Sequence, residues 1–184
     1  DIAAACQGGL RATNHSDSVG LGWSSIEIHG RPGDQALSGP TRPFQIPLGA
    51  LIPCDVDNLL ASGPCLGVTH ITNGAYHCHS TQWNIGEAAG ALAAFCLDQR
   101  CLPAGVQADP ALLRPFQHHL LQAGIPLYWY EDMPPRDDIA TAAHLLAVDG
   151  TWQGTQDHLR FDPAAQVSPA EVAQLALSSN VPID

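Results

Sequence analysis

The chain has 184 residues, of which 45% are apolar, so it is long enough to bury a hydrophobic core. Its formal net charge of −11, from 7 basic and 18 acidic residues, argues against binding to nucleic acid or to an anionic membrane surface. No apolar run reaches the roughly 18 residues that a bilayer requires, so we expect no membrane span, and no segment indicates a cellular location.

The first third of the chain is predicted to be extended and rich in loops. Leu21 to His29 partly fits a half-buried strand. Residues 30–43 contain glycine and proline throughout and predict a long loop. Residues 44–48 and 50–53 are short extended pieces bounded by proline, and residues 58–63 indicate a buried strand that ends in glycine.

The middle of the chain is predicted to contain two helices. Residues 64–80 are rich in Gly, Thr, His and Asn and predict a connecting loop. Residues 81–100 are apolar around much of the girth of a helix, so we expect this helix to be largely buried. Asp109 before Pro110 is typical of a helix start, and we expect this second helix to close at Gly124.

The last third of the chain differs in composition and is predicted to be a separate small unit. Residues 125–136 combine prolines with Tyr, Trp and Tyr and predict a linker that packs its aromatic side chains. Residues 137–148 predict a helix, and a capping box at residues 168–171 predicts the start of a last helix that runs to about residue 178. We therefore divide the chain into residues 1–125 and 126–184.

The block from the predicted strand at residues 58–63 to the helix at residues 81–100 carries the clearest chemical signal. A buried strand that ends in glycine, then a loop and a helix of small residues, is the geometry by which α/β proteins present backbone N–H groups to a cofactor. Gly86 and Gly90, one helical turn apart, allow the helix to lie close against a sheet or a flat ring. An ordinary packing unit without a ligand remains the alternative.

Several ordered motifs in this part of the chain carry a family resemblance. They are Pro43-Phe44-Gln45-Ile46-Pro47, Leu51-Ile52-Pro53, Val56 to Gly63, Cys65, Thr69-His70, Gly74-Ala75 and Gly86-Glu87-Ala88-Ala89-Gly90. Together they resemble the C-terminal end of the FAD-dependent oxidoreductase family, the glutathione-reductase-like flavoproteins sometimes labelled xanthan lyases. The resemblance implies an α/β class, α+β as an isolated fragment: the C-terminal portion of a two-domain FAD-binding fold, plus a small helical appendage.

The resemblance also implies which residues lie against FAD. They are Ser62, Gly63, Gly74, Ala75, Ser80, Thr81, Gln82 and Trp83. The chain departs from the family at two places. The family has arginine at the position of Pro64, and an Arg-x-x-Pro element where this chain has His77-Cys78-His79-Ser80. These departures leave open whether the enzyme is active.

The family's Gly-x-Gly-x-x-Gly turn, which holds the FAD pyrophosphate, does not occur in this chain. The chain also opens at Asp1 without methionine, which suggests that the numbering begins inside a longer polypeptide or after processing. We therefore expect the missing N-terminal FAD-binding half to come from the same chain or from another subunit, and the fragment to be inactive alone. The expected substrate is a small organic molecule.

Histidines supply the catalytic candidates, namely His29, His77 and His79. Glu27 and His29 lie on one side of the predicted strand, where they are either a general base with its orienting carboxylate or a solvated strand face. His77 and His79 in a His-x-His pattern suggest a metal site, but no carboxylate precedes Glu87 to complete one, so we expect no metal.

Two further patterns lie outside this block. Cys96 and Cys101 straddle a predicted helix end, close enough in sequence to form a disulfide, although the geometry cannot be derived from the sequence. The segment from Asp137 to Glu171 is similar to a single degenerate S-layer homology motif. Such motifs generally anchor proteins to cell-wall polymers in groups of three, so we expect a single copy to be an appendage that docks on the main domain. A non-catalytic binding or cell-wall attachment module is the alternative function.

Overall fold

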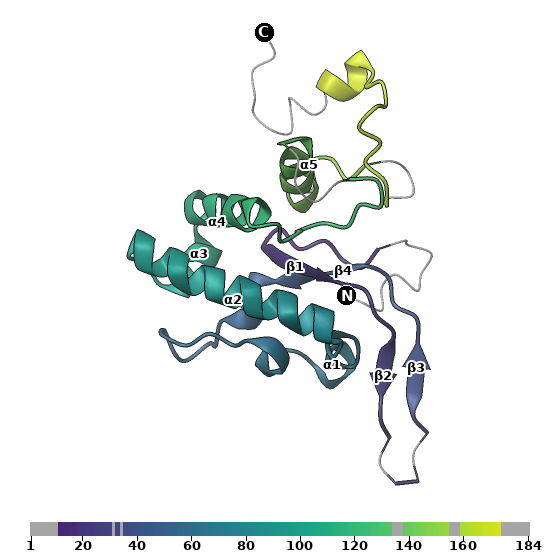
Figure 1. Cartoon of the computed structure of the whole chain (residues 1–184), viewed down its shortest axis with the longest axis vertical. Coiled ribbons are helices and arrows are strands. Elements are labelled where there is room, and N and C mark those ends of the chain that lie inside the picture. The colour runs from purple at the N-terminus through teal and green to yellow at the C-terminus, as the bar shows by residue number, and fades with distance from the viewer. Residues whose placement is uncertain (1–10, 31, 34, 134–137, 155–158, 174–184) are drawn as a thin grey trace.

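The computed structural model describes residues 11–30, 32–33, 35–133, 138–154 and 159–173. It has an α+β fold in which short antiparallel strands pack against helices (Figure 1). The α+β expectation is therefore confirmed at this level. None of the described helices is long and apolar enough to cross a membrane.

The described strands form two separate antiparallel pairs. β1 (Ser18–Gly22) pairs with β4 (Phe44–Pro47) in the body of the molecule. β2 (Ile26–Ile28) pairs with β3 (Leu37–Gly39) and forms an arm at the lower right of Figure 1. The single strand predicted from Leu21 to His29 is thus two strands, and the predicted loop at residues 30–43 contains β3. Pairing across the hairpin decides this structure, and local composition does not reveal it.

The predicted buried strand at residues 58–63 is wrong for this chain. The segment is not a strand, and the side chain of Leu59 is 54% exposed. A strand is stable only when its backbone groups find a neighbouring strand, and no described strand pairs with this segment. The extended piece predicted at residues 50–53 also differs, because Leu48–Leu51 is a 3-10 helix (η2).

The helices follow their capping signals. α2 (His79–Gln99) and α4 (Pro110–Gln122) confirm both helices predicted for the middle of the chain, and Asp109 caps α4 by accepting a hydrogen bond from the Ala111 N–H at 2.9 Å. Two short helices were not predicted, α1 (His70–Tyr76) and α3 (Pro103–Ala108). The Thr69 hydroxyl caps α1 by accepting a hydrogen bond from the Thr72 N–H at 3.1 Å.

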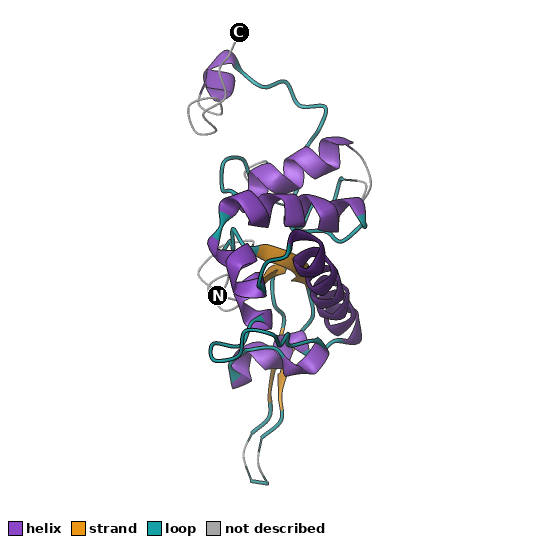
Figure 2. Cartoon of the chain, turned by 90° about the vertical axis from the view of Figure 1, so that its left-hand side faces the viewer, coloured by secondary structure: helices purple, strands orange, loops and turns teal. Residues whose placement is uncertain are grey.

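The hydrophobic core lies where α2 crosses the β1–β4 pair. Viewed from the side, these two strands lie among helices while the β2–β3 arm extends beyond them (Figure 2). Phe44 of β4 stacks on Tyr76 of α1 with ring centroids 4.9 Å apart, and Leu92 of α2 and Phe116 of α4 are fully buried. Burial of such side chains is the main source of stability for a domain of this size.

The tail docks on this body. α5 (Asp138–Val148) packs against α4, and the Asn14 side-chain amide donates hydrogen bonds to the carbonyls of Ala147 and Val148 at 3.3 and 3.1 Å. The predicted capping box is present, since Ser168 and Glu171 exchange side-chain-to-backbone hydrogen bonds at 2.8 and 3.3 Å. The rest of the last predicted helix, from residue 174, lies outside the described residues.

Candidate functional site

The start of α2 gathers four of the predicted cofactor contacts. Ser80, Thr81, Gln82 and Trp83 all lie in its first turns, because the helix begins at His79. The first N–H groups of a helix have no acceptor within it, so this end attracts negative charge. Thr81 is buried, whereas the Trp83 side chain is 72% exposed and does not pack into the chain.

Cys78 precedes the first residue of α2 and is the most perturbed thiol at this end of the helix. Its Sγ lies 3.3 Å from the Ser80 hydroxyl oxygen. Hydrogen bonding from the Ser80 side chain, with smaller contributions from nearby backbone N–H groups, lowers the pKa of the Cys78 thiol. The same environment that lowers this pKa stabilises any negative charge brought to the start of α2.

The glycines of the predicted site fall into two kinds. A Cβ added at Gly74 would lie 2.9 Å from the Glu27 carbonyl oxygen and 3.0 Å from Ile26 and Ile28, so this glycine exists to let α1 approach β2. A Cβ added at Gly63 or Gly90 would meet no atom within 4 Å. Nothing in the described chain therefore accounts for the glycines at these two positions by packing.

The glycines that meet no neighbour lie beside one face of α2. We call this face the open flank of α2 and define it as Ser62, Gly63, Gln82, Gly86 and Gly90. A Cβ added at Gly86 would have only the Ser62 hydroxyl nearby, at 3.6 Å, which is an ordinary contact. Gly63 has φ +55°, a left-handed conformation that glycine adopts without strain. Small residues that face open space leave room for an external flat group or polypeptide to approach the backbone.

Ala75, by contrast, is sealed inside the chain. Its side chain is fully buried, and its carbonyl oxygen accepts a hydrogen bond from the Ser24 hydroxyl at 2.6 Å. Together with Gly74, it joins α1 to the β2 arm. Of the eight predicted cofactor contacts, these two are enclosed by contacts within the chain, whereas Ser62, Gln82 and Trp83 are at least partly exposed.

The structure pairs Glu27 with a different histidine from the one expected. His77 Nε2 lies 3.7 Å from a Glu27 carboxylate oxygen, and its Nδ1 lies 2.7 Å from the Gly74 carbonyl oxygen, which orients the ring. His77 is therefore placed to interact with the Glu27 carboxylate. His29 and His79 are exposed, and neither is brought to Glu27 in the described structure.

A further cavity borders the first turns of α2. It has a volume of about 520 Å³, within the range of roughly 300–1,000 Å³ that is typical of ligand pockets. We call it the aromatic cavity because five aromatic side chains contribute to its walls. They are Trp23, Trp83, Tyr128, Trp129 and Tyr130. Three predicted cofactor contacts, Ser80, Thr81 and Trp83, also line it, so the start of α2 borders both the cavity and the open flank.

His144 of α5 is a buried titratable residue in the wall of the aromatic cavity. Its side chain is 5% exposed, and its Nδ1 accepts a hydrogen bond from the Tyr128 N–H at 3.0 Å. Burial, and then the positive charge of Arg11, lower the pKa of His144 to about 4. The ring is therefore neutral at physiological pH and carries its proton on Nε2.

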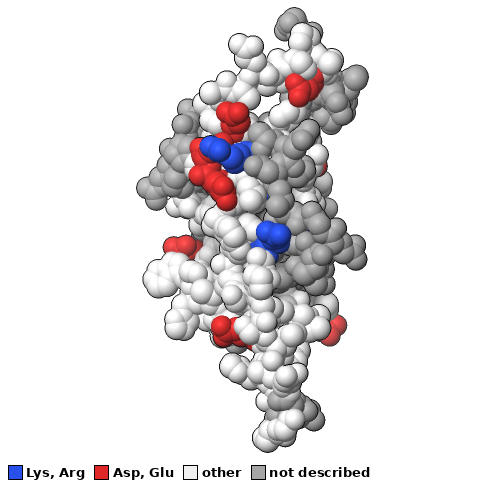
Figure 3. All heavy atoms as spheres, turned by 90° about the vertical axis from the view of Figure 1, so that its right-hand side faces the viewer, with Lys and Arg blue, Asp and Glu red and all other residues white. Residues whose placement is uncertain are grey.

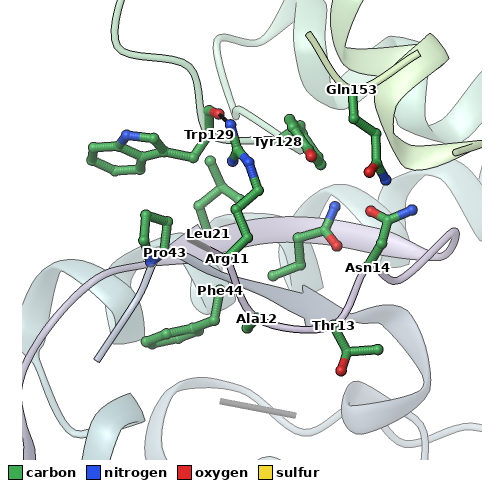
Figure 4. A pocket seen from close by; sticks show the side chains of 11 residues that line it. Arg11, Ala12, Thr13, Asn14, Leu21, Pro43, Phe44, Tyr128, Trp129 and Gln153 are labelled. Atoms are coloured by element: carbon green, nitrogen blue, oxygen red, sulfur yellow. Dashed lines mark hydrogen bonds between the residues drawn. The ribbon is translucent and has the colours of Figure 1, made fainter. Parts of the chain in front are cut away.

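Arg11 packs against the aromatic residues of this wall. Its guanidinium lies 4.1 Å from the centre of the Tyr128 ring and donates a hydrogen bond to the Trp129 carbonyl oxygen. Figure 4 shows the Arg11 side chain rising between Tyr128 and Trp129 in a smaller cavity of about 200 Å³. These contacts make Arg11 part of the support for the wall.

Charge adds little to this site. Figure 3 shows a face of the molecule that is mostly uncharged, with acidic and basic side chains scattered over it. Glu87 is the single charged side chain at physiological pH among the described residues that line the aromatic cavity. Within the described ranges, no group of three or more His, Cys, Asp or Glu side chains is placed to hold a metal ion.

The two cysteines at the end of α2 are neighbours, as their spacing suggested. Arg100 ends the helix in a left-handed conformation, and the Cys101 N–H donates to the Cys96 carbonyl oxygen at 3.0 Å, as in a Schellman motif. Both thiols are free, and burial together with Cys101 raises the pKa of Cys96 to about 11. Whether they form a disulfide stays a prediction.

Sequence reasoning found the start of α2 but missed the aromatic cavity. The packing expected of the aromatic linker is seen, since Leu127 and Tyr128 are buried. His144 gave no signal, because a single histidine in a helix of apolar residues looks like any core position. The linker and α5 are brought to β1 by tertiary contacts that local patterns do not encode.

Comparison with known families gives one match. The model of the family described as FAD dependent oxidoreductase matches residues 4–120. This range includes β1, the open flank and α2, and it ends before the aromatic linker and α5. Neither the curated proteins nor the solved structures gave a match.

Proposed function

Because the chain belongs to the FAD dependent oxidoreductase family, a family that binds FAD, we propose that it is part of a flavoprotein that transfers electrons between a small organic substrate and FAD. The observation that carries this proposal is the start of α2. There, the positive end of the helix, the open flank and the aromatic cavity meet at one place. This is the combination that a flat redox cofactor and its substrate require.

The open flank fits a flat ring. Gly63, Gly86 and Gly90 present backbone without side chains, and Ser62 and Gln82 supply polar groups beside them. We propose that Ser62, Gly63, Gln82 and the N–H groups at the start of α2 hold the isoalloxazine. Ser80, Thr81 and Trp83 then face both cofactor and substrate, because they also line the aromatic cavity.

FAD, when bound, supplies the capacity to accept or donate an electron pair, and this chain supplies its surroundings. The positive end of α2 stabilises negative charge on the ring, as it does on the Cys78 thiolate. His77, oriented by the Gly74 carbonyl and near Glu27, is our first candidate for moving a proton. His29 and His79 remain candidates on sequence grounds alone.

We further propose that the chain is the C-terminal portion of a two-domain, glutathione-reductase-like fold, completed by a half that carries the dinucleotide-binding turn. The support is a surface that looks incomplete. Residues 58–63 have the pattern of a buried strand but no pairing strand among the described residues. Beside them is a groove of about 330 Å³ with three exposed leucines, Leu59, Leu97 and Leu102.

The tail is proposed to be an appendage with S-layer-like ancestry that docks on this body. Its support is the contact of α5 with α4, together with the ion pair of Arg114 with Asp149 and the hydrogen bonds from Asn14. A helix packed in this way is not free to bind a cell-wall polymer through the same face. The attachment function is therefore the weaker alternative.

An absorbance spectrum of the natural full-length protein tests the proposed function. We expect the visible bands of a bound flavin, and a higher melting temperature when FAD is added to protein that has been stripped of it. A colourless protein whose melting temperature does not respond to FAD would overturn the proposal and favour the non-catalytic module.

A further inference from the structure

We propose that the aromatic cavity is a binding site for neutral, flat ring compounds that carry a hydrogen-bond acceptor at one edge, such as aryl ketones. One wall comes from Gly22, Trp23 and the first turns of α2, inside the family match. The other comes from residues 124–133 and His144, beyond that match. The ligand preference is therefore set by a wall that this chain adds to its family domain.

The acceptor requirement comes from His144. Its Nδ1 is occupied by the Tyr128 N–H, so the neutral ring offers an N–H donor at Nε2. No partner for Nε2 is found in the part of the chain that the structure describes. The Nε2 atom is not among the fully buried polar atoms that lack a partner, so a ligand in the cavity can reach it. A ligand acceptor placed there would gain a hydrogen bond with this N–H, worth about 0.5–1.5 kcal/mol.

The same wall contains two more unpaired donors. Trp129 Nε1 and Tyr130 Oη are buried without hydrogen-bond partners among the described residues. Both atoms are shielded from solvent, so a ligand reaches them only if the wall shifts, and His144 Nε2 is the donor that carries the preference for a ligand acceptor.

The charges around the cavity select a neutral ligand. No Lys or Arg is among the described residues that line it, and the carboxylate of Glu87 on the α2 side disfavours an anion. The positive charge of Arg11, which lies against the Tyr128 ring, disfavours a cation in the part of the cavity beside that ring. A neutral molecule with its negative end toward His144 suits both walls.

The shape requirement comes from the aromatic side chains. Aromatic residues bind ring ligands through large flat contacts that lose little conformational entropy. Trp83 and Trp23 are 72% and 47% exposed, so both retain surface that the chain itself does not bury. The ring of a bound ligand would cover this surface.

The statement that the bound compound is a substrate rests on the proposed function. The statement that it binds in the aromatic cavity does not. The test is therefore a direct binding measurement by ligand-observed NMR or calorimetry on the whole protein. Four probes share one ring and differ at its edge: acetophenone (neutral acceptor), isopropylbenzene (no acceptor), benzoate (anion) and phenyltrimethylammonium (cation). We expect acetophenone to bind most tightly, ahead of isopropylbenzene by about threefold to tenfold.

Two variants locate the binding. His144→Phe keeps a ring but removes the donor, so it should weaken acetophenone by about threefold to tenfold and leave isopropylbenzene unchanged. Trp83→Ala, at an exposed position, should weaken every probe. Leu97→Ala is the matched control, because Leu97 is 80% exposed on the same helix but lies outside the cavity, and it should change nothing. If His144→Phe does not fold, the probe series and Trp83→Ala decide alone.

The proposal is overturned if no probe binds, if benzoate or the cation equals acetophenone, or if Trp83→Ala binds as the wild type does. Each measurement is repeated with saturating FAD. Unchanged acetophenone binding supports a ligand site separate from the flavin site. Displacement of acetophenone by FAD would show that the cavity is the flavin site and would overturn the proposal. If acetophenone binds and FAD does not, the proposed function fails and the cavity proposal stands.

Discussion

The junction of α1 with β2 and the open flank of α2 contain the same residue type for different reasons. At the junction, the hydrogen of Gly74 fills the whole space between α1 and the β2 backbone. On the flank, Gly63 and Gly90 face open space. The comparison teaches that one glycine-rich motif serves both internal packing and an external partner, and that only the surroundings of each glycine separate the two uses.

The largest expected effect is a loss of stability in acid, and it comes from His144, a packed residue of the aromatic wall. The pKa of His144 is lowered to about 4, whereas an unfolded histidine titrates near pH 6.5. Above about pH 6.5 both states are neutral and this contribution is complete, and as the pH falls toward 4 the unfolded state binds the proton first. We expect a loss of about 3 kcal/mol of unfolding free energy over this range, measured by urea denaturation.

His144→Phe should remove this component of the pH dependence. His29→Phe is the control, because His29 is exposed and its loss should leave the slope as it is. If the unfolding free energy of wild type and of His144→Phe falls equally as the pH is lowered, the buried histidine is not held neutral and the aromatic wall is less tightly packed than described.

Gly74→Ala is expected to have the next largest effect. The new Cβ would lie 2.9 Å from the Glu27 carbonyl oxygen, so the backbone of α1 or β2 must move. Such overpacking costs about 1–3 kcal/mol, which exceeds the gain of up to about 1 kcal/mol from replacing glycine in a helix. Thermal unfolding should show a lower melting temperature, and a rise would mean that the junction is not tightly packed.

Gly90→Ala should act in the opposite direction by a smaller amount. Its Cβ would meet no atom within 4 Å, so only the helix propensity changes, and we expect stabilisation by up to about 1 kcal/mol. The opposite signs of Gly74→Ala and Gly90→Ala are the sharpest stability test of the comparison. Destabilisation by both would show that the flank is covered within the chain.

The smallest effect concerns the thiol next to the flank. The Ser80 hydroxyl lowers the pKa of Cys78, so Ser80→Ala should slow alkylation of Cys78 by iodoacetamide at pH 7 by a few-fold. Mass spectrometry of the Cys78 peptide measures the rate, and the peptide of the exposed Cys54 is the internal reference. An unchanged ratio would argue against a charge-stabilising environment at the start of α2.

How far the sequence predicts this molecule depends on where the deciding contacts lie. α2 and α4 follow from local periodicity and from the Asp109 cap, and both are confirmed. The strand predicted at residues 58–63 was wrong because an apolar run that ends in glycine does not reveal whether another strand pairs with it, and none of the described strands does. The pairing of Glu27 with His77, and not with His29, depends on the packing of α1 against β2, which no local pattern contains.

The same reasoning explains the candidate site. Ser80, Thr81 and Trp83 could be placed at a helix start because the motif itself ends in a helix. The aromatic linker could be predicted to pack, but its partners, β1 and α2, lie far away in sequence. The role of His144 could not be predicted from the sequence, because it depends on the hydrogen bond that the Tyr128 N–H donates to its ring.

The central claim is that the open flank of α2 exists for a flavin or for the half that binds it. The most direct test is the affinity for FAD of the natural full-length protein with Gly86→Leu, compared with Gly105→Leu in α3, where an added Cβ also meets open space. We predict that Gly86→Leu weakens FAD binding by about tenfold or more and that Gly105→Leu changes it by less than about twofold. Equal FAD affinity in the two variants would contradict the account.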